Sequence, residues 1–309
     1  MKNLLFYGMT ILIWGSTWLA IKFQLGTIDP MVSVAYRFSL AAVILLFWCR
    51  VFRLKMRFSV KDHIGIALQG VFLFALNYLL FYWAELTLTS GLAAVIFSTI
   101  LFMNMVNGAI FLRTPFDSKV ITGGVFGLSG IILVFRGEFS TFHFGDKTFI
   151  AVMLCFAATF LASVGNIISA YNQKKNLPVI QTNAYGMAYG AVLMLILAFV
   201  SGKQFNFSYT PLYIGSLFYL AVFGSIIAFG CYLTLVGNIG ADRAAYATLL
   251  FPIVALFFSM VWEDYKWTPS AIAGISLILC GNLLMLKRKN RQPATENQTM
   301  ETTDEQVCT

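Results

Sequence analysis

The chain is divided along most of its length into apolar runs of about 20 residues, separated by short segments that hold most of the charges. A helix needs about 20 mostly apolar residues to cross the hydrocarbon core of a bilayer. Ten such runs lie at residues 4–25, 31–51, 64–86, 91–112, 120–135, 148–171, 183–201, 212–235, 241–262 and 269–287. The sequence therefore predicts an all-α integral membrane protein with ten transmembrane helices.

The composition argues for the same solvent. Hydrophobic residues make up 59% of the chain and charged residues only 11%, whereas soluble domains carry about 25% charged residues. The net charge is +8, but the basic residues lie in short loops between apolar runs. This pattern indicates membrane topology and argues against a nucleic-acid partner.

Lysine and arginine are distributed unequally between alternate loops. If the N-terminus lies inside, the outer loops hold only Arg136, Lys147, Lys203 and Lys266, and most of the other basic residues fall in the inner segments. The positive-inside rule then places both termini in the cytoplasm. We expect a multi-pass protein of a bacterial inner membrane, with residues 290–309 as a disordered cytoplasmic tail.

A weak internal repeat relates residues 1–140 to residues 141–289. An offset of 150 residues pairs Tyr82 with Tyr232, Ala94 with Ala244, Arg113 with Glu263 and Gly124 with Gly274. Each half contains five predicted spans, so the second half must enter the membrane from the opposite side. Inverted repeats of this kind are typical of secondary transporters that work by alternating access.

Several segments carry a family likeness. They are Trp14–Lys22, Tyr36–Ile44, Trp83–Ile96, and Phe251–Leu256 followed by Trp262 and Glu263. Together they resemble the EamA branch of the drug/metabolite transporter superfamily over about residues 4–287. The resemblance implies two inverted five-helix repeats with a cavity between them. It also implies transport of amino acids, related metabolites or toxic organic compounds, usually outward.

The first half departs from the family pattern in its fourth span. Phe102 stands where the family usually has proline, and Leu112-Arg113 stands where it usually has Gly-Glu. The second half keeps Pro252 and Glu263. We interpret Pro252 as a hinge candidate in the ninth span, although a static kink is the commoner outcome.

Charged side chains within predicted spans are candidates for function, because a charge in lipid is costly. Glu85 either couples transport to protons or binds a substrate amine, or it simply contacts water at the interface. Arg37 either pairs with a substrate carboxylate or extends to the headgroups. Lys22 is similar, with the headgroup interpretation favoured.

Polar and aromatic side chains in the spans complete the predicted cavity. They are Trp14, Ser16 and Thr17 in the first span, Asn77, Tyr78 and Tyr82 in the third, Asn104 in the fourth, Asn166 in the sixth and Tyr232 in the eighth. Each has a structural alternative, in helix packing or interface anchoring. The GxxxG patterns at Gly123–Gly127 and Gly186–Gly190 predict close helix packing, within the chain or at a dimer seam.

Other functional classes lack their motifs. The sequence shows no zinc or disulfide spacing, no nucleotide-binding loop and no hydrolase or protease motif, so we expect neither a metal, a cofactor nor an enzyme. A repeated filter, as in a channel, is also missing. We predict a secondary carrier for amino acids or similar metabolites, acting as a monomer or homodimer, with a proton or counter-substrate as the coupling partner. The alternatives are an importer or exchanger of nucleosides, nucleotide-like or cationic compounds, a channel, or a non-transport membrane protein.

Overall fold

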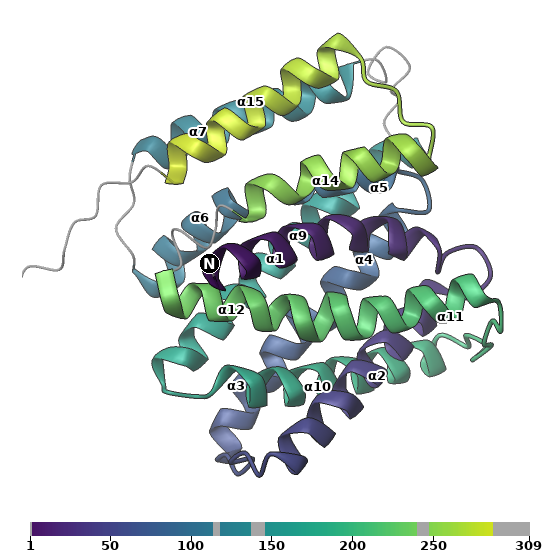
Figure 1. Ribbon diagram of the computed structural model, residues 1–309, viewed down its shortest axis with the longest axis vertical. Coiled ribbons are helices and arrows are strands. Elements are labelled where there is room, and N and C mark those ends of the chain that lie inside the picture. Colours follow the sequence, from purple (N-terminus) through teal and green to yellow (C-terminus); the bar gives the residue numbers. More distant parts are fainter. Residues whose placement is uncertain (1, 114–117, 137–145, 240–246, 287–309) are drawn as a thin grey trace, which may run out of the picture.

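The computed structural model describes residues 2–113, 118–136, 146–239 and 247–286, and the regular elements in these ranges are all helices (Figure 1). They are α1 (Lys2–Lys22), α2 (Pro30–Val51), α3 (Val60–Val71), η1 (Phe72–Leu76), α4 (Asn77–Ala84), α5 (Ser90–Phe97), α6 (Ile100–Leu112), α7 (Ser118–Val134), α9 (Lys147–Lys174), α10 (Val179–Val200), α11 (Pro211–Phe218), η2 (Tyr219–Ile227), α12 (Ala228–Ile239), α14 (Ala247–Trp262) and α15 (Pro269–Leu286). The predicted all-α class is confirmed for these residues.

Seven of the described helical stretches are long and apolar enough to cross a membrane, and three shorter apolar helices lie at Lys119–Val134, Leu250–Trp262 and Pro269–Leu284. Each stretch overlaps one of the predicted runs. The seventh predicted run starts too late, because α10 already begins at Val179. The first residues of the ninth predicted run (241–246), with Ala244, and the tail at 290–309 lie outside the described residues.

Several helices begin at polar caps that the loops supply. Asp29 accepts a hydrogen bond from the backbone of Met31 (2.9 Å) at the start of α2, which has Pro30 in its first turn. Ser59 and Asp62 form a capping box at the start of α3. Such caps satisfy backbone N–H groups that have no partner inside the helix, and they fix where the loops end.

Two of the long helices contain a π-helical segment, η1 between α3 and α4 and η2 between α11 and α12 (Figure 1). A π turn adds a residue to the helix and rotates the side chains that follow it. The Ser225 hydroxyl donates to the carbonyl of Leu220 inside η2 (2.9 Å). The two π segments occupy corresponding places in the two halves of the chain.

The left-handed backbone positions of the described residues also fall in pairs. Residues with positive φ are Gly26, Arg53, Arg113, Asn176, Gly202 and Asp264. Gly26 and Asn176, Arg53 and Gly202, and Arg113 and Asp264 are separated by 149 to 151 residues. Most of these positions follow a helix directly, where an αL residue commonly ends it.

Each main helix packs against a helix of the other half. α2 packs on α10, α7 on α15, and α1 on α12 and α14, while α9 packs on α4 and α6 (Figure 1). When each helix of one half is exchanged for its counterpart in the other half, the first for the sixth and so on up to the fifth for the tenth, the same set of packing pairs results. The pair α7 and α15 lies at one edge of the molecule in Figure 1.

Glycines allow α3 to approach α10, and α7 to approach α15, closely. A Cβ atom at Gly70 would lie 2.2 Å from the carbonyl oxygen of Gly186, and one at Gly274 would lie 2.5 Å from that of Gly130. A Cβ at Gly190 would meet Gly70, and one at Gly281 would meet Gly123. Both predicted GxxxG patterns therefore pack within the chain.

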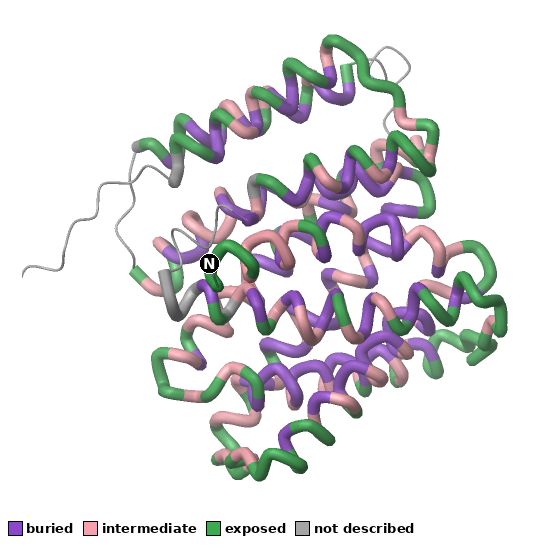
Figure 2. Tube along the Cα trace, in the orientation of Figure 1, coloured by how far each residue is buried: buried purple, intermediate pink, exposed green. Residues whose placement is uncertain are grey.

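Burial follows this arrangement. The buried residues gather where helices face one another, and exposed residues lie mainly on the outward faces and at the helix ends (Figure 2). Many large apolar side chains are nevertheless exposed, among them Val43, Phe199 and Ile110. Exposed apolar surface on this scale is unusual for a soluble monomer and is expected for a lipid-facing one.

Candidate substrate site

The first polar contact between the two halves joins α1 to η2. The Ser16 hydroxyl lies 2.6 Å from the Tyr219 hydroxyl. Thr17 donates to the carbonyl of Trp14 (2.7 Å) and presents its methyl group to Gly224, where a Cβ would lie only 2.8 Å away. Two of the predicted residues, Ser16 and Thr17, thus line the same helix contact.

Arg37 lies in the protein interior next to this contact. Its side chain is only 1% exposed, its Nε donates to the Ser225 hydroxyl (3.3 Å), and its guanidinium carbon lies 4.5 Å from the centre of the Tyr78 ring. Nη1 has no hydrogen-bond partner. The structure therefore does not support the interpretation of Arg37 as a headgroup contact.

An aromatic cluster joins Trp14 of α1 to two rings of α12. The Trp14 ring is 5.1 Å from the ring of Tyr232 and 5.4 Å from that of Phe229. Trp14 and Tyr232, both predicted cavity residues, come together from different halves. Both side chains are partly exposed. Such rings can stack on an apolar or cationic group.

Charged and polar residues gather where α1, α4 and α14 end and α5 begins. The Lys22 ammonium donates to the backbone carbonyl of Glu85 (2.5 Å) and lies 3.7 Å from the Glu263 carboxylate. Glu263 accepts hydrogen bonds from the backbone N–H (2.9 Å) and the hydroxyl of Ser90. We call Lys22, Glu85, Ser90 and Glu263 the charge cluster. Lys22 therefore connects the end of α1 to the end of α4 and to Glu263 after α14, so it is not only a headgroup contact.

Glu85 itself is completely buried, and neither oxygen of its carboxyl group has a hydrogen-bond partner. The interpretation of Glu85 as a water-exposed interface residue does not fit this burial. Nearby, the Tyr82 hydroxyl donates to Gln24 (3.0 Å), and both residues are buried. Tyr82 and Tyr232, paired by the repeat, do not share a contact among those described.

The remaining predicted residues are divided. Asn166 donates to Asn104 (3.4 Å), which joins α9 to α6. Asn77 is 3% exposed, and its Oδ1 has no partner. Pro252 lies inside α14, which continues through it as one helix to Trp262. The hinge remains a prediction for Pro252.

Sequence reasoning missed the partners of these residues. Gln24, Tyr219, Ser225 and Phe229 contact the predicted residues but were not singled out. Ser90 was also missed, and Glu263 was noted only as a repeat mate and in the family likeness. The only available signal was weak, because single polar residues in an apolar run are also common in helix packing.

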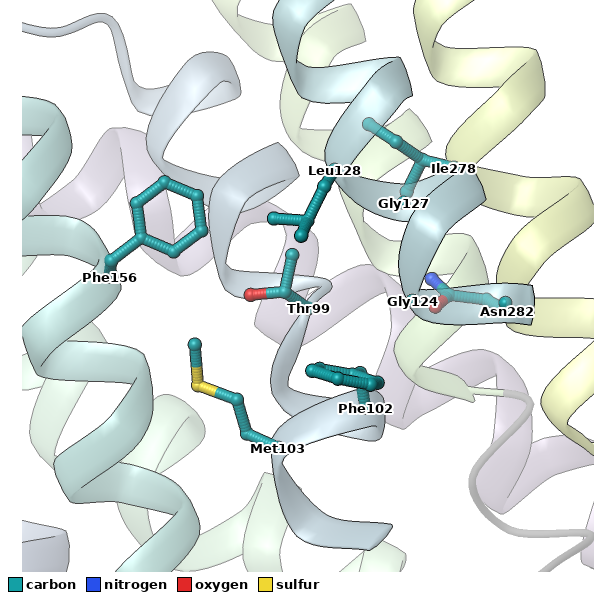
Figure 3. A pocket seen from close by; sticks show the side chains of 10 residues that line it. Thr99, Phe102, Met103, Gly124, Gly127, Leu128, Phe156, Ile278 and Asn282 are labelled. Carbon is teal, nitrogen blue, oxygen red and sulfur yellow. The ribbon is translucent and has the colours of Figure 1, made fainter. Parts of the chain in front are cut away.

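Two hollows flank these contacts. A groove of about 520 Å³ opens between the first turns of α1 and α10 and the end of α12, at the opposite end of α1 from the charge cluster, and Phe6, Gln181 and Cys231 are among its lining residues. A smaller apolar pocket of about 100 Å³ lies between α6, α7, α9 and α15 (Figure 3). In this pocket Phe102 packs over Gly124, where a Cβ would lie 2.5 Å from its ring. Among the described residues no group of side chains could hold a metal ion.

Comparison with known proteins places this architecture in a family. The model of the EamA-like transporter family matches residues 2–136 and again residues 149–287. The chain belongs to this family, and it is a multi-pass membrane protein of the transporter class. The resemblance seen in the sequence is thereby confirmed.

Relatives along the whole chain carry transporter names. The uncharacterized transporter YoaV of Bacillus subtilis (strain 168) is 25% identical over 87% of this chain and 91% of its own length. The probable amino-acid metabolite efflux pump of Escherichia coli (strain K12) is 25% identical over 88% of this chain and 91% of its own length. A solved crystal structure with 15% sequence identity shares the fold, with a TM-score of 0.67 over 91% of this chain and 95% of that one.

Proposed function

We propose that this protein is a secondary carrier that moves small metabolites, chiefly amino acids or related compounds, by alternating access between two inverted five-helix repeats. The observation that carries the proposal is the contact of first-half residues with second-half residues around Trp14, Ser16 and Arg37. A solute held there touches both halves at once. Its access then changes whenever one half rocks against the other.

Four observations support the repeat, with 1–140 as one half and 141–289 as the other. The family model matches each half separately. The π segments, the paired αL positions and the exchange of helix partners each recur with an offset close to 150 residues. The π segments, the αL positions and the helix pairs depend on backbone geometry and not on side-chain identity. These three observations therefore support the repeat independently of the weak sequence match. Ten spans and cytoplasmic termini in a bacterial inner membrane follow from the same scheme.

The lining supports a small amphipathic solute. Trp14, Tyr78 and Tyr232 offer aromatic faces, and Arg37, Ser16 and Thr17 offer polar groups. The relative from Escherichia coli named a probable amino-acid metabolite efflux pump supports amino acids and the outward direction. Glu85 is the coupling candidate, because it is the buried carboxyl group without a hydrogen-bond partner among the described residues. The alternative is an importer or exchanger of another metabolite class.

Counterflow into proteoliposomes tests the proposal. Purified protein is reconstituted, the vesicles are loaded in turn with pooled unlabelled amino acids, nucleosides or polyamines, and uptake of the matching labelled pool is followed. Saturable accumulation of one class that competitors abolish is expected for a carrier. Linear, non-saturable entry would indicate a channel, and no entry of any class by monodisperse protein would contradict a carrier of these solutes.

A matched pair of variants links transport to the site. Tyr232→Ala removes a ring from the aromatic cluster, whereas Tyr209→Ala removes an exposed ring from the loop before α11. We expect the first to weaken transport by about tenfold or more, as loss of a stacking contact in a closed site does. The second should transport like the wild type. Equal transport by both variants would remove Tyr232 from the site.

A further inference from the structure

Arg37 is a buried cation without an acidic partner. Its side chain is 1% exposed, its Nε donates to the neutral hydroxyl of Ser225, and Nη1 has no hydrogen-bond partner among the described residues. The ion pairs among the described residues join Lys22 to Glu263 and Lys203 to Asp29, so neither includes Arg37. A buried charge without a compensating partner is destabilising, so an anion that reaches Arg37 would stabilise the protein.

Glu85 shows the opposite deficit. Its carboxyl group is completely buried and unpartnered. Ionisable groups of several neighbouring segments interact with it: Lys22 of α1, Arg37 of α2, Tyr82 of α4, Cys155 of α9 and Glu263 after α14. Of the cations, Lys22 acts on Glu85 most strongly, and it is also the counter-ion of Glu263. Arg37 is the second cation whose charge an ionised Glu85 offsets, without a direct contact.

Small and hydroxyl-bearing residues surround the guanidinium. A Cβ at Gly224 of η2 would lie 3.5 Å from Nη2 of Arg37 and 2.8 Å from the Thr17 methyl group, so the η2 backbone and not a bulky side chain faces the guanidinium here. The hydroxyls of Ser225 and Thr17 lie on the same contact. A guanidinium presents its N–H groups as a planar fork, which matches the two oxygens of a carboxylate.

We propose that Arg37 binds the carboxylate of the transported solute and that this carboxylate takes over from Glu85 as counter-charge. With both glutamates ionised and no solute bound, Lys22, Arg37, Glu85 and Glu263 sum to zero charge. A bound solute with one net negative charge, such as a keto acid, adds one negative charge, which a proton taken up from the solvent by Glu85 cancels, whereas a zwitterionic amino acid carries its own ammonium and adds none. Anion binding and proton uptake at Glu85 then favour each other reciprocally, so the affinity for the carboxylate rises as pH falls.

This inference rests on the proposed carrier function and narrows it to solutes with a carboxylate. Transport is measured in proteoliposomes with three labelled pools: amino acids and keto acids, the corresponding amino-acid amides, and nucleosides with polyamines. The wild type is compared with Arg37→Gln, Arg37→Lys and Glu85→Gln. Arg50→Gln, at the exposed end of the same helix α2, is the control for removing an arginine.

We expect saturable flux only from the carboxylate pool. Arg37→Gln should lower it by about tenfold or more, the loss expected for a hydrogen bond to a charged group. Arg37→Lys, which keeps the charge and loses the fork, should fall between Arg37→Gln and the wild type, and Arg50→Gln should match the wild type. Keto-acid flux should increase toward acidic pH in the wild type and be insensitive to pH in Glu85→Gln.

Four results would overturn the inference. Saturable flux only from the amide pool, or only from the nucleoside and polyamine pool, would support the carrier function but contradict carboxylate binding by Arg37. Carboxylate flux that survives Arg37→Gln would contradict the role of Arg37. The same pH profile of the keto-acid flux in the wild type and in Glu85→Gln would contradict the role of Glu85. No flux from any pool, with all proteins monodisperse, removes the carrier and the inference together. If Arg37→Gln fails to fold, the double variant Arg37→Gln/Glu85→Gln removes both unpaired charges, and its carboxylate flux decides in the same way.

Discussion

Glu263 is the residue on which the charge cluster depends. It accepts from the backbone and hydroxyl of Ser90 at the first turn of α5 and is the counter-ion of Lys22. A carboxylate at a helix N-terminus is stabilising, and hydrogen bonds to a charged group contribute about 1.5–3 kcal/mol. Since both side chains are partly exposed, we expect Glu263→Ala to lower the free energy of unfolding by about 2 kcal/mol.

The matched variant is Glu263→Gln, which keeps an oxygen acceptor toward Ser90 and loses the charge. We expect it to be less destabilised than Glu263→Ala, because an amide oxygen still accepts from the backbone N–H. Thermal unfolding in detergent, followed by tryptophan fluorescence, measures both variants. Equal stability of Glu263→Ala and the wild type would show that the contact contributes nothing.

At this scale the sequence predicted the charged residues but not their partners. Glu85 and Arg37 could be singled out because a charge in an apolar run is conspicuous. Their burial, and the contacts of Ser90 with Glu263 and of Ser16 with Tyr219, join residues 173 and 203 positions apart. No local periodicity encodes such distances, so the sequence could not decide between the two interpretations of Arg37.

At the scale of helices, the tightest of the described glycine contacts predicts the effect of a substitution. A Cβ at Gly70 would lie 2.2 Å from a backbone oxygen of α10, and neither backbone can yield without moving a helix. We expect Gly70→Ala to be destabilised by about 1–3 kcal/mol, the usual cost of overpacking. Gly127→Ala, also within a helix but with no atom within 4 Å of its Cβ, is the control.

The control should change stability in the opposite direction, because alanine in a helix is favoured over glycine by about 0.5–1 kcal/mol. Thermal unfolding of the two variants side by side measures the difference. If Gly70→Ala were as stable as Gly127→Ala, the packing of α3 on α10 would be looser than the structure shows.

Helix existence was predictable from hydropathy, but helix detail was not. The long apolar runs predicted most spans within a few residues, whereas the fourth run is divided into α5 and α6 around Ser98 and Thr99. The π segment η1 has neither proline nor glycine. Such irregularities arise from packing against other helices, and a single apolar run carries no record of that packing.

At the scale of the whole molecule, the inverted repeat makes a prediction about sidedness. Lys55 follows α2 and Gln204 follows α10, at corresponding places in the two halves, and both are exposed. An inverted repeat places corresponding loops on opposite faces of the membrane. The positive-inside rule puts the arginine- and lysine-rich loop around Lys55 in the cytoplasm and hence Gln204 outside.

Single cysteines at these two positions test the prediction in the same background, a chain whose native cysteines are replaced by alanine or serine and which still transports. A membrane-impermeant maleimide should label Gln204→Cys in intact cells, and Lys55→Cys only after the membrane is opened. Opposite sides are required whatever the absolute orientation, because an even number of membrane crossings between the two loops would return the chain to the side it started from. Labelling of both cysteines from the same side would therefore contradict the inverted repeat itself, and with it the symmetry on which rocking between two halves depends.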